Sequence, residues 1–434
     1  MDSRPAYFFG DSGAYLTTAT TKWIPSDRSF LYGYLLRRIA YHSHSLEAMI
    51  VVQVVLSAIA AWLLCFALAE FFDAPFFIAA AAGLFCALEP MQLLAERYVM
   101  TDSVATALFA IYFVLVLQYV RRGSTWILLV FQAVGVLLIG IRISFLPAVI
   151  VNSFAVPLVT RHASKPSTRN IAWGLIASLA IEIGLLSVYA HSYGRLIHRE
   201  PALFYGQGAF LIADFAPLIE PEDFPVSSAR TPIFDNLRFD RHDPAQRSFH
   251  HFADGGLWAN VEKEFPDPKQ ANDLAASTAI HALLRQPFRA AELAAGSLAQ
   301  YFHPAVLGRW LLDDEGAYND MSEDTRESLQ RYYSVPNPNH FEISLTKKWH
   351  QFAIPWYWIV LCSLALSPGL LFICAIDLRG SVFLCVLSAL LFLEGATLTI
   401  EHPTPRFLTT AAWLTLLMIG AAMARTGRTA AGEF

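Results

Sequence analysis

The chain has 434 residues, of which 55% are hydrophobic and 15% charged, and its mean hydropathy is +0.42. That composition is too apolar for a water-soluble globule, and the chain is too long for a single span, so it predicts an all-α polytopic membrane protein. The formal net charge is −5 and no basic stripe stands out, which excludes nucleic acid as a partner.

Apolar stretches close to the ~20 residues needed to cross a bilayer predict about nine transmembrane helices. No internal repeat relates them. Only Arg142 separates the fourth stretch from the fifth, which predicts a tight turn at one face of the membrane. The stretches cover residues 47–71, 75–92, 103–120, 125–141, 143–160, 171–190, 352–376, 381–399 and 407–424.

These spans divide the chain into four regions. The first is a loop whose apolar residues recur at helical spacing between 30 and 41, which predicts an amphipathic helix lying in the membrane interface. The third is a large loop domain, with one helix at about 270–302 and otherwise irregular structure. The regions are the first loop at 1–46, the first part of the bundle at 47–191, the loop domain at 192–350, and the closing helices and tail at 351–434.

The basic residues of the short loops set the orientation, because such residues favour the cytoplasmic side. Four loops agree when the nine spans are threaded alternately, so the first loop and the loop domain are expected outside the cytoplasm. The basic residues of the first loop argue the other way, and no signal sequence precedes it. We therefore expect that loop either to cross unaided or to follow a span encoded upstream of Met1. The four loops carry Arg121 and Arg122; Arg161, Lys165 and Arg169; Arg379; and Arg425 and Arg428.

Asp11 lies between Gly10 and Gly13 near the start of the chain. Glycines let the backbone approach a ligand closely, and a carboxylate there could take the proton of an attacking hydroxyl group. The alternative is that Asp11 or Ser12 caps a short helix.

A second polar segment runs from Glu96 to Ser103, directly before a predicted span. Thr101, Asp102 and Ser103 are all good helix N-caps, and a helix end in a membrane protein must satisfy its free N–H groups. Capping is compatible with function, because a carboxylate fixed at its own helix terminus is also rigidly aimed.

Arg142 and Arg406 fall on one side of the membrane in the predicted topology. Arginine suits a phosphate diester, because it is permanently charged and donates two parallel hydrogen bonds. Two arginines on one face therefore favour an anion site. The alternatives are that Arg142 reaches up to lipid phosphates and that Arg406 belongs to a helix-initiating turn with Pro405.

Glu182 and Glu394 lie within predicted spans, where carboxylates are functional candidates by default. Glu182 is deep in its span, which would suit proton coupling. An ion-coupled transporter or lipid flippase using Glu182 is therefore the alternative function, although the paired, broken helices and symmetry typical of transporters are absent from the sequence.

The order of these motifs resembles a known class of membrane enzymes. It begins with Gly-Asp-Ser-x-x-Tyr at 10–15 and Arg28-Ser-Phe-Leu-Tyr-Gly at 28–33, and continues with Met-Thr-Asp-Ser at 100–103, Arg142, one long loop, and Pro-Arg-Phe at 405–407. This order is similar to that of the GT-C class of polyprenyl-phosphate-sugar-dependent membrane glycosyltransferases, the superfamily of protein mannosyltransferases and aminoarabinose transferases.

The resemblance implies a bacterial inner-membrane transferase that moves a sugar, with inversion, from a polyprenyl-phosphate carrier to an acceptor hydroxyl outside the cytoplasm. The acceptor would be a glycan, lipid or protein. Asp11 matches the general base, and Asp102 matches a second acidic position near the acceptor or a divalent metal. The helix that precedes the first loop in the family is absent here, and its Asp-Glu motif reads Asp11-Ser12. The expected site comprises Asp11 and Asp102 as catalytic residues, Arg142, Arg406 and Arg28 for the lipid phosphate, and Tyr15, Glu96 and His402 for substrate.

Overall fold

Helices make up every regular element in the part of the chain that the structure describes, and no strand occurs in that part. The structure is a computed structural model. It describes Pro5, Tyr7, Trp349 and residues 11–26, 28–159, 168–303, 305–309, 322–335, 353–373, 376–400 and 404–430.

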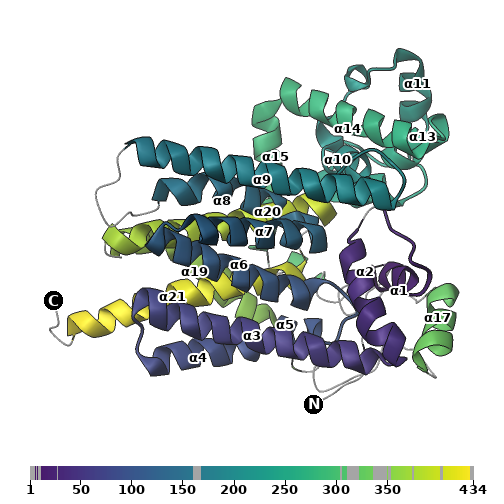
Figure 1. The fold of residues 1–434 in the computed structure, drawn as a ribbon. Coiled ribbons are helices and arrows are strands. Elements are labelled where there is room, and N and C mark those ends of the chain that lie inside the picture. The colour runs from purple at the N-terminus through teal and green to yellow at the C-terminus, as the bar shows by residue number, and fades with distance from the viewer. Residues whose placement is uncertain are drawn as a thin grey trace.

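Within the described residues, nine long or apolar helices lie side by side in one bundle (Figure 1). Five segments of the described chain are long and apolar enough to cross a membrane, namely Leu46–Phe72, Asp102–Arg122, Ile171–Leu196, Arg379–Ala396 and Pro405–Ala424. The chain is therefore a membrane-embedded helical protein. The bundle consists of α3 (Leu46–Phe72), α4 (Phe76–Ala87), α6 (Asp102–Arg122), α7 (Thr125–Ile141), α8 (Leu146–Val159), α9 (Thr168–Leu196), α19 (Ala353–Ile373), α20 (Ile376–Ile400) and α21 (Leu408–Ala430).

The predicted stretches coincide with these helices except at the second. There α4 stops at Ala87, and a separate helix, α5 (Pro90–Ala95), follows. Glu89 causes the break, because its carboxylate accepts hydrogen bonds from the backbone N–H groups of Met91 and Gln92 and so caps a new helix with Pro90 at its first position. With 12 residues, α4 is ~18 Å long, shorter than the ~30 Å hydrocarbon core.

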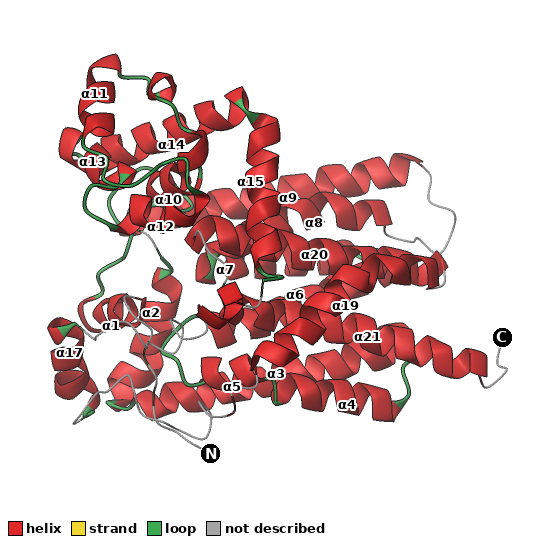
Figure 2. Cartoon of the chain, turned by 180° about the vertical axis from the view of Figure 1, so that it is seen from behind, coloured by secondary structure: helices red, strands yellow, loops and turns green. Residues whose placement is uncertain are grey.

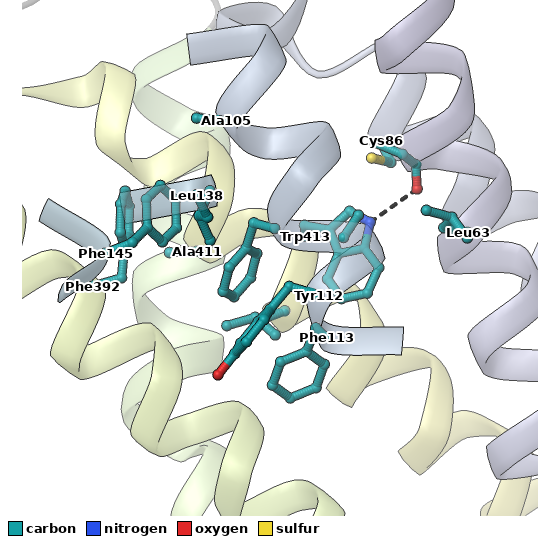
Figure 3. Packing of buried hydrophobic residues seen from close by; sticks show 14 of the residues in the cluster. Leu63, Cys86, Ala105, Tyr112, Phe113, Leu138, Phe145, Phe392, Ala411 and Trp413 are labelled. Carbon is teal, nitrogen blue, oxygen red and sulfur yellow. Dashed lines mark hydrogen bonds between the residues drawn. The ribbon is translucent and has the colours of Figure 1, made fainter. Parts of the chain in front are cut away.

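Aromatic side chains fill the centre of the bundle (Figure 3). Trp413 of α21 is 1% exposed, and its indole N–H donates to the carbonyl oxygen of Ala60 on α3 at 2.9 Å. The rings of Phe145 and Phe392 stack with centroids 4.3 Å apart, which joins the 3₁₀ turn just before α8 to α20. This packing fixes the helix ends that carry the polar residues described below.

The first loop folds onto one end of the bundle as α1 (Asp11–Thr21) and α2 (Phe30–Leu36), which continues as a π-helical turn, Arg37–Tyr41 (Figure 1). We call this the α1 end. The predicted helix between residues 30 and 41 is thus present. Tyr32 is fully buried, and its hydroxyl donates to Gln53 Oε1 of α3 at 2.8 Å, so the helix packs on protein. A further helix, α17 (Glu323–Tyr333), packs against α1.

The loop domain is more regular than the sequence predicted. Residues 207–300, which we call the outer domain, form short helices around their own apolar core, which includes Ile212, Phe224 and Leu257. The single helix expected at about 270–302 is two helices, because Pro287 starts a new one at an elbow. The helices are α10 (Gln207–Asp214), α11 (Ser227–Asp235), α12 (Arg247–Phe252), α13 (Leu257–Glu264), α14 (Pro268–Arg285) and α15 (Pro287–Gln300).

Candidate functional site

Four chain segments that lie far apart in the sequence meet at the α1 end of the bundle. They are the start of α1, the start of α6, the turn between α7 and α8, and the short 3₁₀ helix η6 (Pro405–Phe407) that precedes α21. Each contributes a charged side chain. The site is therefore assembled by tertiary structure from separate helix termini.

Asp11 is the first residue of α1, where a helix N-terminus favours a carboxylate. Its Oδ1 accepts a hydrogen bond from Arg28 Nη1 at 2.6 Å, and its Oδ2 lies 3.6 Å from Arg406 Nη1. The next residue, Ser12, donates its hydroxyl to the carbonyl oxygen of Val99 at 3.0 Å, which ties α1 to the segment before α6. Asp11 thus joins two arginines that are 378 positions apart in the chain.

Asp102 and Arg142 form a second ion pair close by. Asp102 opens α6, and Arg142 occupies an extended position between α7 and α8, from which its guanidinium group donates to Asp102 Oδ1. Asp102 Oδ2 is buried without a hydrogen-bond partner among the described residues. One oxygen of this carboxylate can therefore accept a bond from a ligand.

The ring of Phe407 connects the two ion pairs. The guanidinium carbon of Arg142 lies 4.4 Å from the ring centroid, and that of Arg406 lies 5.1 Å from it. Cations are attracted to an aromatic face at such distances. Arg406 also donates to the sulfur of Met100 at 3.8 Å. The two arginines are therefore held side by side on one ring.

Tyr15 lies within reach of both ion pairs. Burial raises the pKa of the Tyr15 hydroxyl above its usual range. Asp11 adds to this rise in pKa, Arg28 and Arg142 oppose it, and Asp102 also raises the pKa. The Tyr15 ring packs edge-on against the ring of Tyr32, with centroids 4.9 Å apart. Tyr15 is thus a neutral hydroxyl held among the charges.

The cluster of Asp11, Arg28, Asp102, Arg142 and Arg406 carries three guanidinium groups and two carboxylates, so its net charge is one positive. The side chains of Asp11 and Arg28 are 29% and 22% exposed, whereas those of the other three members are at most 14% exposed. A ligand would therefore approach from the Asp11 and Arg28 side and meet a positive, partly dehydrated surface.

Glu96, another predicted substrate residue, is not part of this cluster. Glu96 is only 8% exposed. Burial raises the pKa of its carboxyl group to about 7, although a hydrogen bond from the Ser57 hydroxyl partly lowers that pKa. Glu96 belongs to a buried polar group in which Gln53 Nε2 donates to the carbonyl oxygens of Glu96 and Tyr98. His402 lies outside the described residues.

Two contributors to the site escaped sequence reasoning. In the sequence Phe407 stands out only as part of the Pro-Arg-Phe motif, because no spacing in the chain indicates that one ring contacts two distant arginines. Gln53 positions the backbone before α6. The sequence feature that could have indicated this role is a single amide side chain inside an apolar span. Among the described residues, no group of three or more His, Cys, Asp or Glu side chains could hold a metal ion.

Removing one partner of the Asp102 and Arg142 pair is expected to destabilise the bundle. Arg142→Ala would leave a buried carboxylate unpaired, at a cost of roughly 3–5 kcal/mol in the free energy of unfolding. The melting temperature of the purified protein in detergent should fall for Arg142→Ala and partly recover in the double variant Arg142→Ala, Asp102→Ala. An unchanged melting temperature in the single variant would contradict the pairing.

Comparison with known proteins identifies no relative: no family model, curated protein or solved structure matches the chain.

Proposed function

We propose that this protein is an integral membrane glycosyltransferase that moves a sugar from a polyprenyl-phosphate carrier to an acceptor hydroxyl group, with inversion at the anomeric carbon. The observation that carries the proposal is the convergence of Asp11, Asp102 and three arginines at one end of a membrane-embedded bundle. Polytopic threading of nine spans, with this end outside the cytoplasm of a bacterial inner membrane, belongs to the same proposal.

The charge of the cluster supports a phosphodiester ligand. A polyprenyl-phosphate sugar carries one negative charge at its diester, which would neutralise the single net positive charge of the five side chains. Guanidinium groups bind such phosphates through paired N–H donors. A membrane-embedded site also matches a donor whose polyprenyl chain stays in the bilayer.

The reaction follows from these positions. The acceptor oxygen attacks the anomeric carbon and forms the new C–O bond, while its proton passes to an oxygen of Asp11. The bond between the anomeric carbon and the phosphate oxygen breaks, and its electron pair leaves with the polyprenyl phosphate. Arg142 and Arg406 stabilise the second negative charge that then develops on the phosphate. One base is sufficient, because a phosphate leaving group needs little protonation.

Donor binding would also free the base. Asp11 is paired with Arg28 and lies near Arg406, so both of its carboxylate oxygens face arginines. A phosphate placed among the arginines competes for the same N–H donors. The carboxylate of Asp11 would then turn toward the acceptor, so that the base becomes available only when the donor is bound.

The direct test is a transfer assay with purified protein in lipid nanodiscs. A panel of polyprenyl-phosphate sugars is supplied with an extracted-lipid and glycan fraction as acceptor, and release of polyprenyl phosphate is measured. We expect at least one donor to be consumed with stoichiometric appearance of a glycosylated product. Failure of every donor in the panel, with protein that retains its native melting temperature, would reject the proposal.

A transporter that uses Glu182 is the second candidate function, and one observation favours it. Glu182 is 2% exposed inside α9, where its Oε2 accepts a hydrogen bond from the Ser153 hydroxyl of α8 at 3.3 Å. Beside it, Gln132 of α7 donates to Ser178 of α9 at 2.6 Å. A buried carboxyl group in such surroundings could exchange a proton.

Glu182→Gln separates the two functions. If the protein is a transferase, the amide should keep the hydrogen bond to Ser153 and leave sugar transfer within about twofold of the unsubstituted protein, because Glu182 lies in the middle of α9 and away from the charge cluster. Transfer is measured in nanodiscs, and uptake of labelled solute is measured in proteoliposomes. Flux that disappears in Glu182→Gln would favour the transporter instead.

A further inference from the structure

The outer domain carries an apolar edge at the elbow between α14 and α15. Ile280, Leu284 and Phe288 are 45%, 75% and 90% exposed. Ile280 and Leu284 lie one turn apart at the end of α14, and after the elbow Phe288 shares a face of α15 with the exposed Ala291 and Ala295. Large apolar side chains at such exposure, gathered on one edge, mark a contact surface. We call these five residues the α15 face.

The position of α15 sets it apart from the rest of the outer domain. It contacts α20, and in both views it runs across the bundle helices and not along them (Figures 1 and 2). The other outer-domain helices lie farther out along the bundle axis, α11 most clearly. The α15 face therefore borders the outside of the bundle, where lipid surrounds the spans.

Contacts within the fold fix the depth of α15. Its buried Ser297 accepts a hydrogen bond from Arg247 at 3.1 Å, and Arg247 lies 3.6 Å from Asp214. Asp214 is the last residue of α10, and α10, like α15, contacts α20, the helix that carries Glu394. The next residue of α20, Gly395, packs so closely on the carbonyl oxygen of Ser144 that a side chain there would collide with it.

Ser144 belongs to the turn between α7 and α8, two residues after Arg142. The C-terminal half of α15 thus lies at the level of the bundle ends that carry the charge cluster. A helix that crosses the spans at that level, with one side open, would meet the boundary between lipid headgroups and acyl chains. The lipid leaflet at that end of the bundle is the surface that covers such a helix.

We propose that the α14 and α15 elbow is an interfacial membrane anchor, which inserts Leu284 and Phe288 into the lipid leaflet at the α1 end. Ala291 and Ala295 let α15 lie flat on that leaflet. The charged residues on the exposed side, Arg289 and Glu292, are long enough to reach the headgroups from the interface plane. This anchor would keep the outer domain beside the bundle at the membrane surface. It does not depend on the proposed glycosyltransferase reaction.

The test measures contact between this edge and lipid in the full-length protein. The five native cysteines are replaced by alanine, Phe288→Cys or Ala291→Cys is introduced, and the new thiol is labelled with bimane in phosphatidylcholine vesicles. We expect nitroxide-bearing lipid to quench these labels at least twofold more than a label at Ser228→Cys, and aqueous iodide to quench them less. Ser228 serves as the matched control, because it is an exposed residue of α11 and that helix lies away from the bundle in both views.

Two results would overturn the anchor. Quenching by iodide equal to that of the Ser228→Cys label, without extra quenching by lipid, would place the edge in water. A label shielded from both quenchers would mean that protein, such as a second copy of the chain, covers it. Retention of the unlabelled protein's melting temperature in each cysteine variant shows that the fold is intact.

Discussion

Asp11→Asn is expected to lower sugar transfer by roughly 10²- to 10⁴-fold, the range by which a positioned general base accelerates a reaction. Asparagine has nearly the same shape and can still occupy the start of α1, so the change removes the proton acceptor while leaving the backbone in place. Turnover of polyprenyl-phosphate sugar is measured in nanodiscs under donor saturation, where the loss should appear in kcat.

The control for this variant is the same chemical change at the opposite end of the bundle. Asp73 is exposed at the C-terminus of α3, in a left-handed conformation with φ 49° that asparagine tolerates well. Asp73→Asn should transfer sugar at the unsubstituted rate. Turnover near that rate in Asp11→Asn, with the protein still in the membrane, would remove Asp11 from the role of base and leave the cluster as a binding site only.

Arg406→Ala is expected to lower kcat/KM for the polyprenyl-phosphate donor by roughly 10²- to 10³-fold, comparable with loss of one donor to a developing oxyanion. Both KM and kcat should worsen, because Arg406 would bind the diester before reaction and stabilise the extra charge afterwards. Arg406→Lys should recover only part of this loss, since an ammonium group keeps the charge but lacks the paired N–H donors.

Arg121→Ala serves as the matched control for Arg406→Ala. Arg121 pairs with Glu70 at 2.7 Å at the far end of α6, with its side chain 55% exposed, so its removal should change neither donor affinity nor rate. Arg406→Ala also deletes a buried side chain, so its melting temperature is compared with that of the unsubstituted protein. An unchanged KM for the donor in well-folded Arg406→Ala would place the phosphate elsewhere.

Some features of the fold could be predicted residue by residue, because local chemistry decides them. The span predicted at 125–141 coincides with α7 at both ends, since Arg142 cannot continue an apolar helix into the membrane. The stretch at 75–92 was misjudged, because hydropathy does not register that the buried carboxylate of Glu89 can cap a new helix. The sequence also predicted too few helices in the outer domain, because the helices of that domain are short and polar on one face.

Sequence alone determined the membrane character of the chain, its helical class, and the identity of the charged residues near the helix ends, because apolar length and helix-end chemistry are local properties. Tertiary packing decided which of those residues meet. It brought Asp11 to Arg28 and Arg406 and placed two arginines on the Phe407 ring. It also laid α15 across α20. Such pairings depend on the order in which helices pack, and that order is a property of the whole bundle.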